Sequence, residues 1–208
     1  LIDYISKFKK PIILSTGMNN IKSIKKSVNI IKKHKTKFAL LHCTNLYPTP
    51  HKLVRLGAMV QMMKEFKNIP IGLSDHSVGI NTCLGAVALG ASIIEKHFTP
   101  DKKYKGPDIS SSIDAKELKS LIKGSQEIYL ARGGKKEPLD EEKKTINFAF
   151  ASVVAIKDIK KGEKLTNKNI WVKRPFTGDF STNDYFKILG KRARQIIRSG
   201  EQLKKKDI

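Results

Sequence analysis

The sequence predicts an α/β protein that contains the C-terminal half of a (β/α)8 TIM barrel, followed by a smaller domain of short strands. Three observations lead to this prediction. Strand and helix patterns alternate over the first two thirds of the 208 residues, polar side chains follow every predicted strand, and a twelve-residue motif occurs twice in the last third. Alternating strands and helices are typical of a parallel sheet covered by helices.

Four short hydrophobic runs are the expected strands, at residues 11–15, 37–43, 69–73 and 91–98. Their hydrophobic residues are continuous rather than alternating, as in parallel strands that are buried on both faces. A helix pattern follows each run, and we expect helices at residues 21–33, 53–66, 81–90 and 114–131. In the first of these helices, isoleucine and valine recur at helical spacing, with lysines on the opposite side.

The absence of a glycine-rich motif after the strands favours a barrel over a doubly wound sheet. Ser15, His42, His76 and His97 stand near these ends, and both folds place an active site at the C-terminal edge of the sheet. No glycine-rich phosphate-binding fingerprint follows any of the strands, as it would in a nucleotide-binding sheet. Four strands cannot close a barrel, so we expect this chain to hold only the second half.

The pattern changes near residue 133. We expect the half barrel at residues 1–133, a glycine-rich and charged linker at 134–147, and the second domain at 148–208. In the second domain, residues 159–170 recur as 197–208, with six of the twelve positions identical. Two copies of one hairpin-like unit, turning at Gly162 and Gly200, predict a small pseudo-symmetric β domain.

The net charge of +22 and the pI near 10.0 raise the hypothesis of a nucleic-acid partner. Only six of the 41 basic residues are arginine, and the other 35 are lysines scattered over helix faces. Nucleic-acid sites favour arginine and place aromatic residues between the charges. A lysine bias of the source organism therefore explains the charge better, with attraction of anionic substrates as the smaller alternative, and we expect no nucleic-acid partner.

The sequence also predicts a cytoplasmic protein without a membrane partner. Its apolar runs are much shorter than the ~20 residues that span a bilayer, and the N-terminus lacks a signal-peptide pattern. Cys43 and Cys83 lie in apolar surroundings, which favours buried free thiols in a reducing compartment. The first residue is Leu1 rather than methionine, which indicates an incomplete product.

Two histidines at neighbouring strand ends suggest a metal site. Side chains two residues apart on a strand share a face, so Ser74 points the same way as His76, and Glu95 the same way as His97. Parallel strands lie about 4.8 Å apart, which allows both imidazoles to reach one divalent ion of the Mn, Zn or Fe type. The alternative is that each histidine is an ordinary polar residue at a strand end.

Four further residues have polar side chains that an active site could use. Asn45 and Tyr47 lie in a loop stiffened by two prolines, or in an ordinary connecting loop. Ser15 precedes a helix whose N-terminus suits a phosphate, although Ser15 alone could equally be the helix cap. Asp108 lies in a Gly-Pro-Asp turn that is long enough to lean over a barrel mouth, but this sequence is also common in turns.

The motifs together resemble one enzyme family along essentially the whole chain. The strings PIILSTGMNN, LLHCTNLYPTP, IGLSDHSVG, CLGAVALGASIIEKHFT, LARGGKK, FAFASVVA and IWVKRPF are similar to those of the bacterial sialic acid synthases, typified by N-acetylneuraminate synthase. This resemblance implies a TIM barrel followed by an antifreeze-like β-clip domain, the SAF domain. It also implies condensation of phosphoenolpyruvate with N-acetylmannosamine or a related amino sugar, with release of phosphate. The implied cofactor is a divalent metal, Mn²⁺ first, with Mg²⁺ or Co²⁺ as alternatives.

The resemblance implies a role for each matching residue. His76 and His97 would bind the metal and act in catalysis through it. The residues matched to phosphoenolpyruvate are Ser15, Asn45 and Ser74, and those on the sugar side are Tyr47 and Asp108. Arg174 matches an SAF-domain arginine that reaches the N-acetyl group of the partner's sugar in a domain-swapped homodimer.

The resemblance also implies that part of the enzyme lies outside this sequence. Relatives carry four earlier strands with catalytic glutamates and phosphate-binding lysines, and none of these can be assigned here. We therefore expect the missing N-terminal half of the barrel as a partner and no synthase activity from the 208 residues alone. The alternatives are a non-catalytic fragment with a carbohydrate-contacting or dimerising SAF module, and a synthase for legionaminic or pseudaminic acid.

Overall fold

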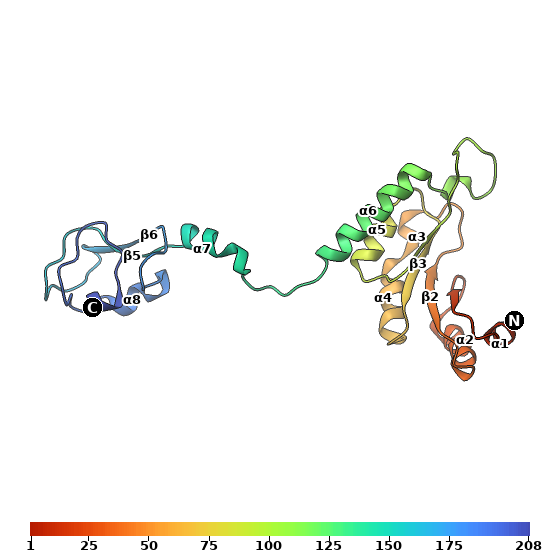
Figure 1. The fold of residues 1–208 in the computed structure, drawn as a ribbon, viewed down its shortest axis with the longest axis horizontal. Helices are drawn as coiled ribbons and strands as arrows, with labels where there is room; N and C mark the ends of the chain where they lie inside the picture. Colours follow the sequence, from red (N-terminus) through yellow and green to blue (C-terminus); the bar gives the residue numbers. More distant parts are fainter. The chain divides into compact units, whose positions relative to one another are not determined.

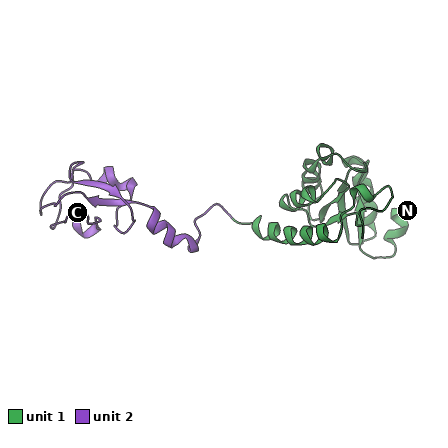
Figure 2. Cartoon of the chain, turned by 90° about the horizontal axis from the view of Figure 1, so that it is seen from above, with its two compact units in different colours: residues 1–134 green, residues 135–208 purple.

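A computed structural model describes all 208 residues, which form two compact units, Leu1–Gly134 and Lys135–Ile208 (Figure 2). The stretch at 134–147, expected as a linker, contains the 3-10 helix η2 (Asp140–Glu142) and the start of helix α7 (Lys143–Ala149). The Glu142 carboxylate accepts the backbone N–H of Leu139 at 2.8 Å, which is a bond typical of a helix start. Acidic residues that resemble a linker in sequence therefore begin a helical segment.

The first unit is built on a four-stranded parallel sheet (Figure 1). Its strands are β1 (Ile12–Ser15), β2 (Phe38–Cys43), β3 (Ile71–Asp75) and β4 (Ile94–Lys96), and each pairs with the next along the chain. This order, with a helical connection after each strand, is that of half a TIM barrel, as predicted. Two strands differ from the prediction by more than one residue: β3 lies two residues later than the expected 69–73, and β4 is shorter than the expected 91–98.

The helices of the first unit follow the predicted order with one correction. They are α1 (Ile2–Ser6), α2 (Ile21–Lys33), α3 (His51–Val54), α4 (Leu56–Glu65), α5 (Asn81–Ala88) and α6 (Ala115–Ala131). The single helix expected at 53–66 is wrong, because Arg55 has a left-handed backbone (φ 53°) and separates α3 from α4. Helix α1 was not predicted. None of the helices of either unit is long and apolar enough to cross a membrane.

The hydrophobic core of the first unit lies between one face of the sheet and the helices. Leu40 and Leu73 of the sheet pack there with Val28 of α2 and Met59 of α4. Neighbouring side chains alternate between the two faces of a strand, so Ile13 points away from this core and is 57% exposed. The exposed face corresponds to the interior of a closed barrel.

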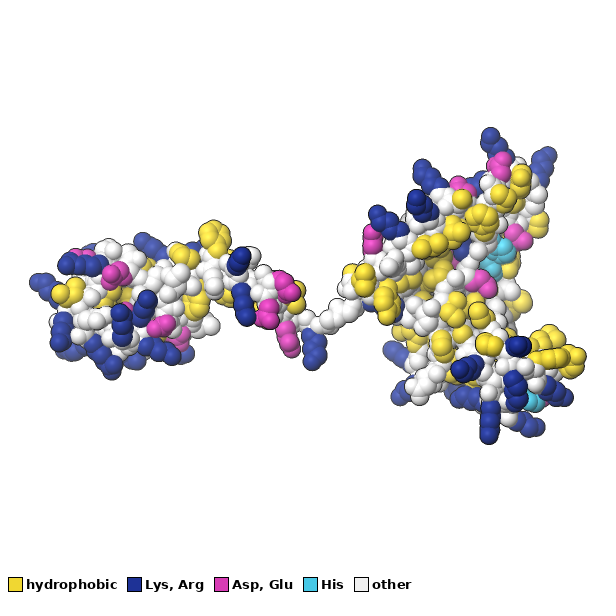
Figure 3. All heavy atoms as spheres, in the orientation of Figure 1, with side chains coloured by type: hydrophobic (Ala, Val, Ile, Leu, Met, Phe, Trp, Pro, Cys, Tyr) yellow, Lys and Arg dark blue, Asp and Glu magenta, His cyan; other side chains and the backbone are white.

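The second unit has its own core around a small antiparallel sheet. Strands β5 (Ser152–Ala155) and β6 (Ile170–Lys173) pair, and the short helices η3 (Thr182–Asp184), α8 (Tyr185–Ile188) and η4 (Lys205–Asp207) complete the unit. Its core includes Val153, Ile159, Leu165, Ile170, Ile188, Ile197 and Leu203. Figure 3 shows lysine and arginine side chains, in dark blue, spread over the visible face of both units.

The sequence repeat of the second unit is also a structural repeat. Ile159 and Ile197, the first residues of the two copies, pair with each other through N–H···O bonds of 2.8 and 3.0 Å. Gly162 and Gly200 both have positive φ, 82° and 89°, which favours glycine. Equivalent carboxylates cap each turn, since Glu163 accepts the N–H of Lys160 and Glu201 that of Arg198, both at 2.8 Å. The copies therefore pack as two related halves of one core.

Candidate active site

The C-terminal ends of β3 and β4 bring two histidines together. His76 follows β3 and His97 follows β4, and their ring centroids are 5.1 Å apart. Ser74 and Glu95 are opposite one another in the register of the sheet, and they line the same hollow as the two imidazoles. Its volume is about 240 Å³. The structure thus brings together the two residues expected to bind metal.

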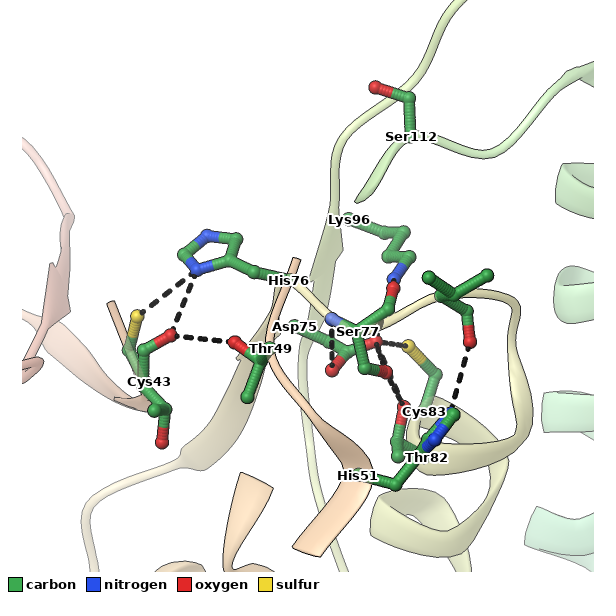
Figure 4. Close-up of polar contacts among 12 residues, drawn as sticks. Cys43, Thr49, His51, Asp75, His76, Ser77, Thr82, Cys83, Lys96 and Ser112 are labelled. Carbon is green, nitrogen blue, oxygen red and sulfur yellow. Dashed lines mark hydrogen bonds and ion pairs between the residues drawn. The ribbon is translucent and has the colours of Figure 1, made fainter. Parts of the chain in front are cut away.

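The two ring nitrogens of His76 differ in their hydrogen bonding. Nδ1 lies 3.2 Å from the carbonyl oxygen of Thr44, which can only accept, so this nitrogen carries the proton. In the neutral imidazole, Nε2 is then the nitrogen with the free lone pair, as in many metal-binding histidines. Cys43 Sγ lies 3.9 Å from the same Nδ1 (Figure 4).

Tyr47 covers the histidine pair from the loop after β2. Its ring is stacked on His76 with centroids 4.2 Å apart, and it meets His97 edge-on at 5.9 Å. Burial raises the pKa of the Tyr47 phenol, with smaller contributions from negative charge on Cys43, Asp108 and Glu95.

The residues expected to hold phosphoenolpyruvate stand at three successive strand ends. Ser74 is buried and donates its hydroxyl to Glu95 Oε1 at 2.6 Å. Asn45 lies against Gly17, where a Cβ atom would stand 1.8 Å from the amide oxygen, so only glycine leaves room for it. Ser15 ends β1 and is exposed. Their strand positions therefore match the predicted edge of the sheet.

Asp108 and Arg174 lie in loops. Asp108 is exposed in the connection between β4 and α6, where it precedes the 3-10 helix η1 (Ile109–Ser111). Arg174 is exposed in the second unit, directly after β6. The contact predicted for Arg174 involves another subunit and stays a prediction.

A buried ion pair behind the histidines was not predicted. Asp75 Oδ2 lies 2.7 Å from Lys96 Nζ, and the two side chains are only 1% and 3% exposed. Burial raises the pKa of Asp75, but bonds from Lys96, Ser77 and Thr82 outweigh this and lower the pKa overall. The sequence carries only a weak signal of it, since Asp75 lies two residues beyond the strand predicted at 69–73 and Lys96 lies within the one predicted at 91–98.

Comparison with known proteins identifies the family. Residues 1–137 match the NeuB family, and residues 150–208 match the SAF domain. This chain belongs to the NeuB family. The half barrel and the small β domain described above are accordingly its NeuB and SAF portions, as the sequence motifs predicted.

Several relatives of this NeuB-family chain are named synthases. The N,N'-diacetyllegionaminic acid synthase of Campylobacter jejuni is 44% identical over 96% of this chain and 60% of its own length. The pseudaminic acid synthase of the same species is 40% identical over 98% of this chain and 59% of its own length. A solved N-acetylneuraminic acid synthetase from Leptospira borgpetersenii superposes with a TM-score of 0.65 and 38% identity, over 70% of this chain and 51% of that structure. The chain thus spans about 60% of the curated relatives it matches.

The histidine pair of this NeuB-family chain fits a divalent ion. Two imidazoles that bind one ion at about 2.1 Å have ring centres roughly 5 Å apart, and the observed separation is 5.1 Å. Among the 208 residues, no group of three His, Cys, Asp or Glu side chains gathers to hold a metal. The pair would therefore supply two ligands, leaving positions for water, substrate or residues outside this chain.

Proposed function

We propose that this chain forms the C-terminal part of an enzyme that condenses phosphoenolpyruvate with the aldehyde of an N-acetyl amino sugar and releases phosphate. The observation that supports it most is the placement of His76 and His97 beside one another, under Tyr47, at the strand ends of a NeuB half barrel. The synthase names of relatives up to 44% identical agree with this proposal.

In this proposal His76 and His97 hold a divalent ion, Mn²⁺ first, with Mg²⁺ or Co²⁺ as alternatives. When bound, the ion supplies Lewis-acid polarisation of the sugar's aldehyde oxygen. The bond between His76 Nδ1 and the Thr44 carbonyl fixes which nitrogen faces the ion. The stacked Tyr47 ring restricts rotation of the same imidazole.

Ser15, Asn45 and Ser74 would bind phosphoenolpyruvate, chiefly its phosphate, through hydroxyl and amide groups. Carbon 3 of phosphoenolpyruvate attacks the aldehyde carbon to form the new C–C bond, and the aldehyde oxygen takes a proton. Water adds to the cationic carbon 2 and releases one proton, which balances the proton taken by the aldehyde oxygen. Phosphate then leaves as its bond to carbon 2 breaks, and the new hydroxyl gives its proton to the departing phosphate and becomes the keto group. The strand ends contribute mainly proximity, because they hold the two reactants at one edge of the sheet.

Tyr47 and Asp108 would contact the sugar, and Arg174 would reach the N-acetyl group in the partner subunit of a homodimer. A planar, always charged guanidinium suits this contact better than the lysines that predominate in this chain.

The acceptor sugar has two candidates. The sequence motifs favour N-acetylmannosamine, the substrate of N-acetylneuraminate synthesis. The names of the two Campylobacter relatives, at 44% and 40% identity, favour instead the diacetamido sugars that lead to legionaminic and pseudaminic acid. Parallel assays with each sugar distinguish the candidates.

The experiment combines this chain with the N-terminal portion of the Campylobacter legionaminic acid synthase, which this chain does not span. Phosphate release from phosphoenolpyruvate is measured with each sugar and with added Mn²⁺. We expect release from the combination, none from the chain alone, and loss of release in His76→Ala and His97→Ala. His34→Ala is the matched control, because His34 lies elsewhere and bonds to Asp3.

Two results would overturn the proposal. One is full activity of the His76→Ala and His97→Ala variants in the combined enzyme. The other is the absence of phosphate release with every sugar although both parts are folded and associated. Turnover by the 208 residues alone would contradict the narrower expectation that the remaining strands are required.

A further inference from the structure

The side chains next to the two histidines form a buried cage on the opposite face of the sheet. Figure 4 shows His76 directed toward Cys43, whereas Asp75 is directed toward Ser77, Cys83 and Lys96. This division follows from strand geometry, because successive side chains alternate between faces. Asp75 and Lys96 therefore direct their charged groups to the opposite face of the sheet, although both residues also contribute to the lining of the hollow between the histidines.

The ion pair joins the two strands at the last rung before the histidines. Asp75 and Lys96 are directly opposite in the register of β3 and β4, and each is followed by a histidine. Their 2.7 Å contact fixes the lateral and axial placement of the two strand ends at this rung. His76 and His97 leave the sheet from this point.

Lys96 also contacts the backbone on the C-terminal side of His76. Its ammonium donates to the carbonyl oxygen of Ser77 as well as to Asp75, so it contacts the residues immediately before and after His76. Asp75 closes the same turn, since it accepts the Ser77 N–H at 3.2 Å and the Ser77 hydroxyl at 2.9 Å. Thr82 of α5 donates to Asp75 at 2.9 Å and anchors the turn to the helix layer.

A buried ion pair is an inefficient way to stabilise a fold. Removing two charges from water offsets much of their attraction, and apolar residues of similar volume often serve as well. The directional bonds of the pair, in contrast, define one arrangement of the backbone on both sides of His76. The Asp75–Lys96 ion pair is thus better suited to fixing the backbone around His76 than to stabilising the fold.

We propose that Asp75 and Lys96 are positioning residues that set the separation and orientation of the His76 and His97 rings. This inference rests on the proposed function in one respect, namely that the two imidazole rings bind a divalent ion. In this inference the two side chains are not ligands of the ion. They act through the backbone that carries the two imidazoles.

The test uses the 208-residue chain and the double variant Asp75→Asn/Lys96→Met. Asn retains one acceptor oxygen for the Ser77 N–H, and its amide N–H can donate to the Ser77 and Thr82 hydroxyls, which also accept. Met retains the length of the lysine side chain without its charge. Single variants would leave one buried charge unpaired and could fail to fold, so the double variant is the informative one. The control is Lys25→Met/Glu65→Gln, which removes a 2.8 Å surface pair and, like the double variant, leaves the net charge unchanged.

Three quantities are measured: the thermal unfolding midpoint, Mn²⁺ affinity from the electron paramagnetic resonance signal of free Mn²⁺, and the nuclear Overhauser effect between the His76 and His97 ring protons without metal. We expect the double variant to unfold near the wild-type temperature, to bind Mn²⁺ about 10–100-fold more weakly, and to lose the inter-ring effect. The control should match wild type in all three.

Wild-type Mn²⁺ affinity together with an unchanged inter-ring effect in the folded double variant would overturn this inference and leave the pair a purely structural feature. If Mn²⁺ binds neither to the wild-type chain nor to its combination with the N-terminal portion of the relative, the metal role in the proposed function fails. The inter-ring effect of the metal-free chain still decides whether the ion pair positions the rings, so the two failures are distinguishable.

Discussion

Tyr47 is stacked on His76, with ring centroids 4.2 Å apart and ring planes at 27°. Tyr47 comes from the loop after β2, and His76 from the end of β3, so the contact joins two successive strand-to-helix connections. The imidazole is therefore held by the Thr44 carbonyl at Nδ1 and by an aromatic ring over its face. Both restraints act before any ligand arrives.

We predict that Tyr47→Phe retains this restraint and Tyr47→Ala abolishes it. The stacked ring shifts the His76 ring-proton resonances, so nuclear magnetic resonance should give similar shifts for wild type and Tyr47→Phe and different shifts for Tyr47→Ala. An aromatic pair contributes about 0.5–1.5 kcal/mol beyond its buried area, so Tyr47→Ala should also lower the free energy of unfolding by roughly this amount. Identical His76 resonances in all three proteins would contradict the prediction.

The core of the second unit can be tested with two adjacent isoleucines, one buried and one exposed. Ile197 is 1% exposed and pairs with Ile159, whereas the adjacent Ile196 is 58% exposed. We predict that Ile197→Ala lowers the free energy of unfolding of this unit by about 2–5 kcal/mol. Ile196→Ala should change it by about 0.5 kcal/mol or less. Urea unfolding followed by Trp171 fluorescence measures both, and equal effects would refute the assignment of the core.

The Cys83 thiol should be unreactive in the folded protein. It is fully buried, and burial, together with the Asp75 charge, raises its pKa to about 12. Because the thiolate is the reactive form, iodoacetamide at about pH 8 should label Cys83 only after unfolding in urea. Peptide mass spectrometry measures this, and rapid native labelling would show that the helix α5 contact opens readily.

The raised pKa of Cys83 also predicts that the folded protein loses stability in alkali. The unfolded thiol ionises near its ordinary value of 9.0, while the folded thiol keeps its proton to about 12. Above about pH 9 the unfolded state therefore binds fewer protons than the folded state, and stability falls as the pH rises. Cys83→Ala should remove this contribution to the pH dependence.

Asp184 should contribute stability that is lost in acid. Bonds from Lys187 and from the hydroxyl and N–H of Ser181 lower its pKa from 3.8 to about 2. The contribution is present above about pH 4 and lost as the pH falls through about 2, because the unfolded carboxyl takes up a proton first. Asp184→Asn should therefore melt below wild type at neutral pH, with the difference closing in acid. Asp140→Asn is the matched control, since Asp140 has the same spacing to its lysine at 2.9 Å but lies at the exposed start of η2.

The regular parts of the fold were predictable because they depend on local pattern. Helix α2 begins and ends at the predicted residues, since its apolar side chains repeat at helical spacing and Asn20 caps its start through Ser23. The break at Arg55 was not predictable, because arginine has no preference for the left-handed backbone that it adopts there. The pairing of Ile159 with Ile197 was suggested by the repeat, but only the fold brings the two copies together.

The sequence by itself determined the order of strands and helices in the first unit, the two histidines that follow neighbouring strands and the motifs of the NeuB family, because each depends on residues that are near one another in the chain. Only the tertiary structure decided that Tyr47 lies over His76 and that Asp75 pairs with Lys96 behind it. These contacts join different strands and loops. A charged residue in the sequence does not show which residue of another strand it will contact. The physical reason is that burial and register, which select such partners, arise only when the sheet and its helices pack.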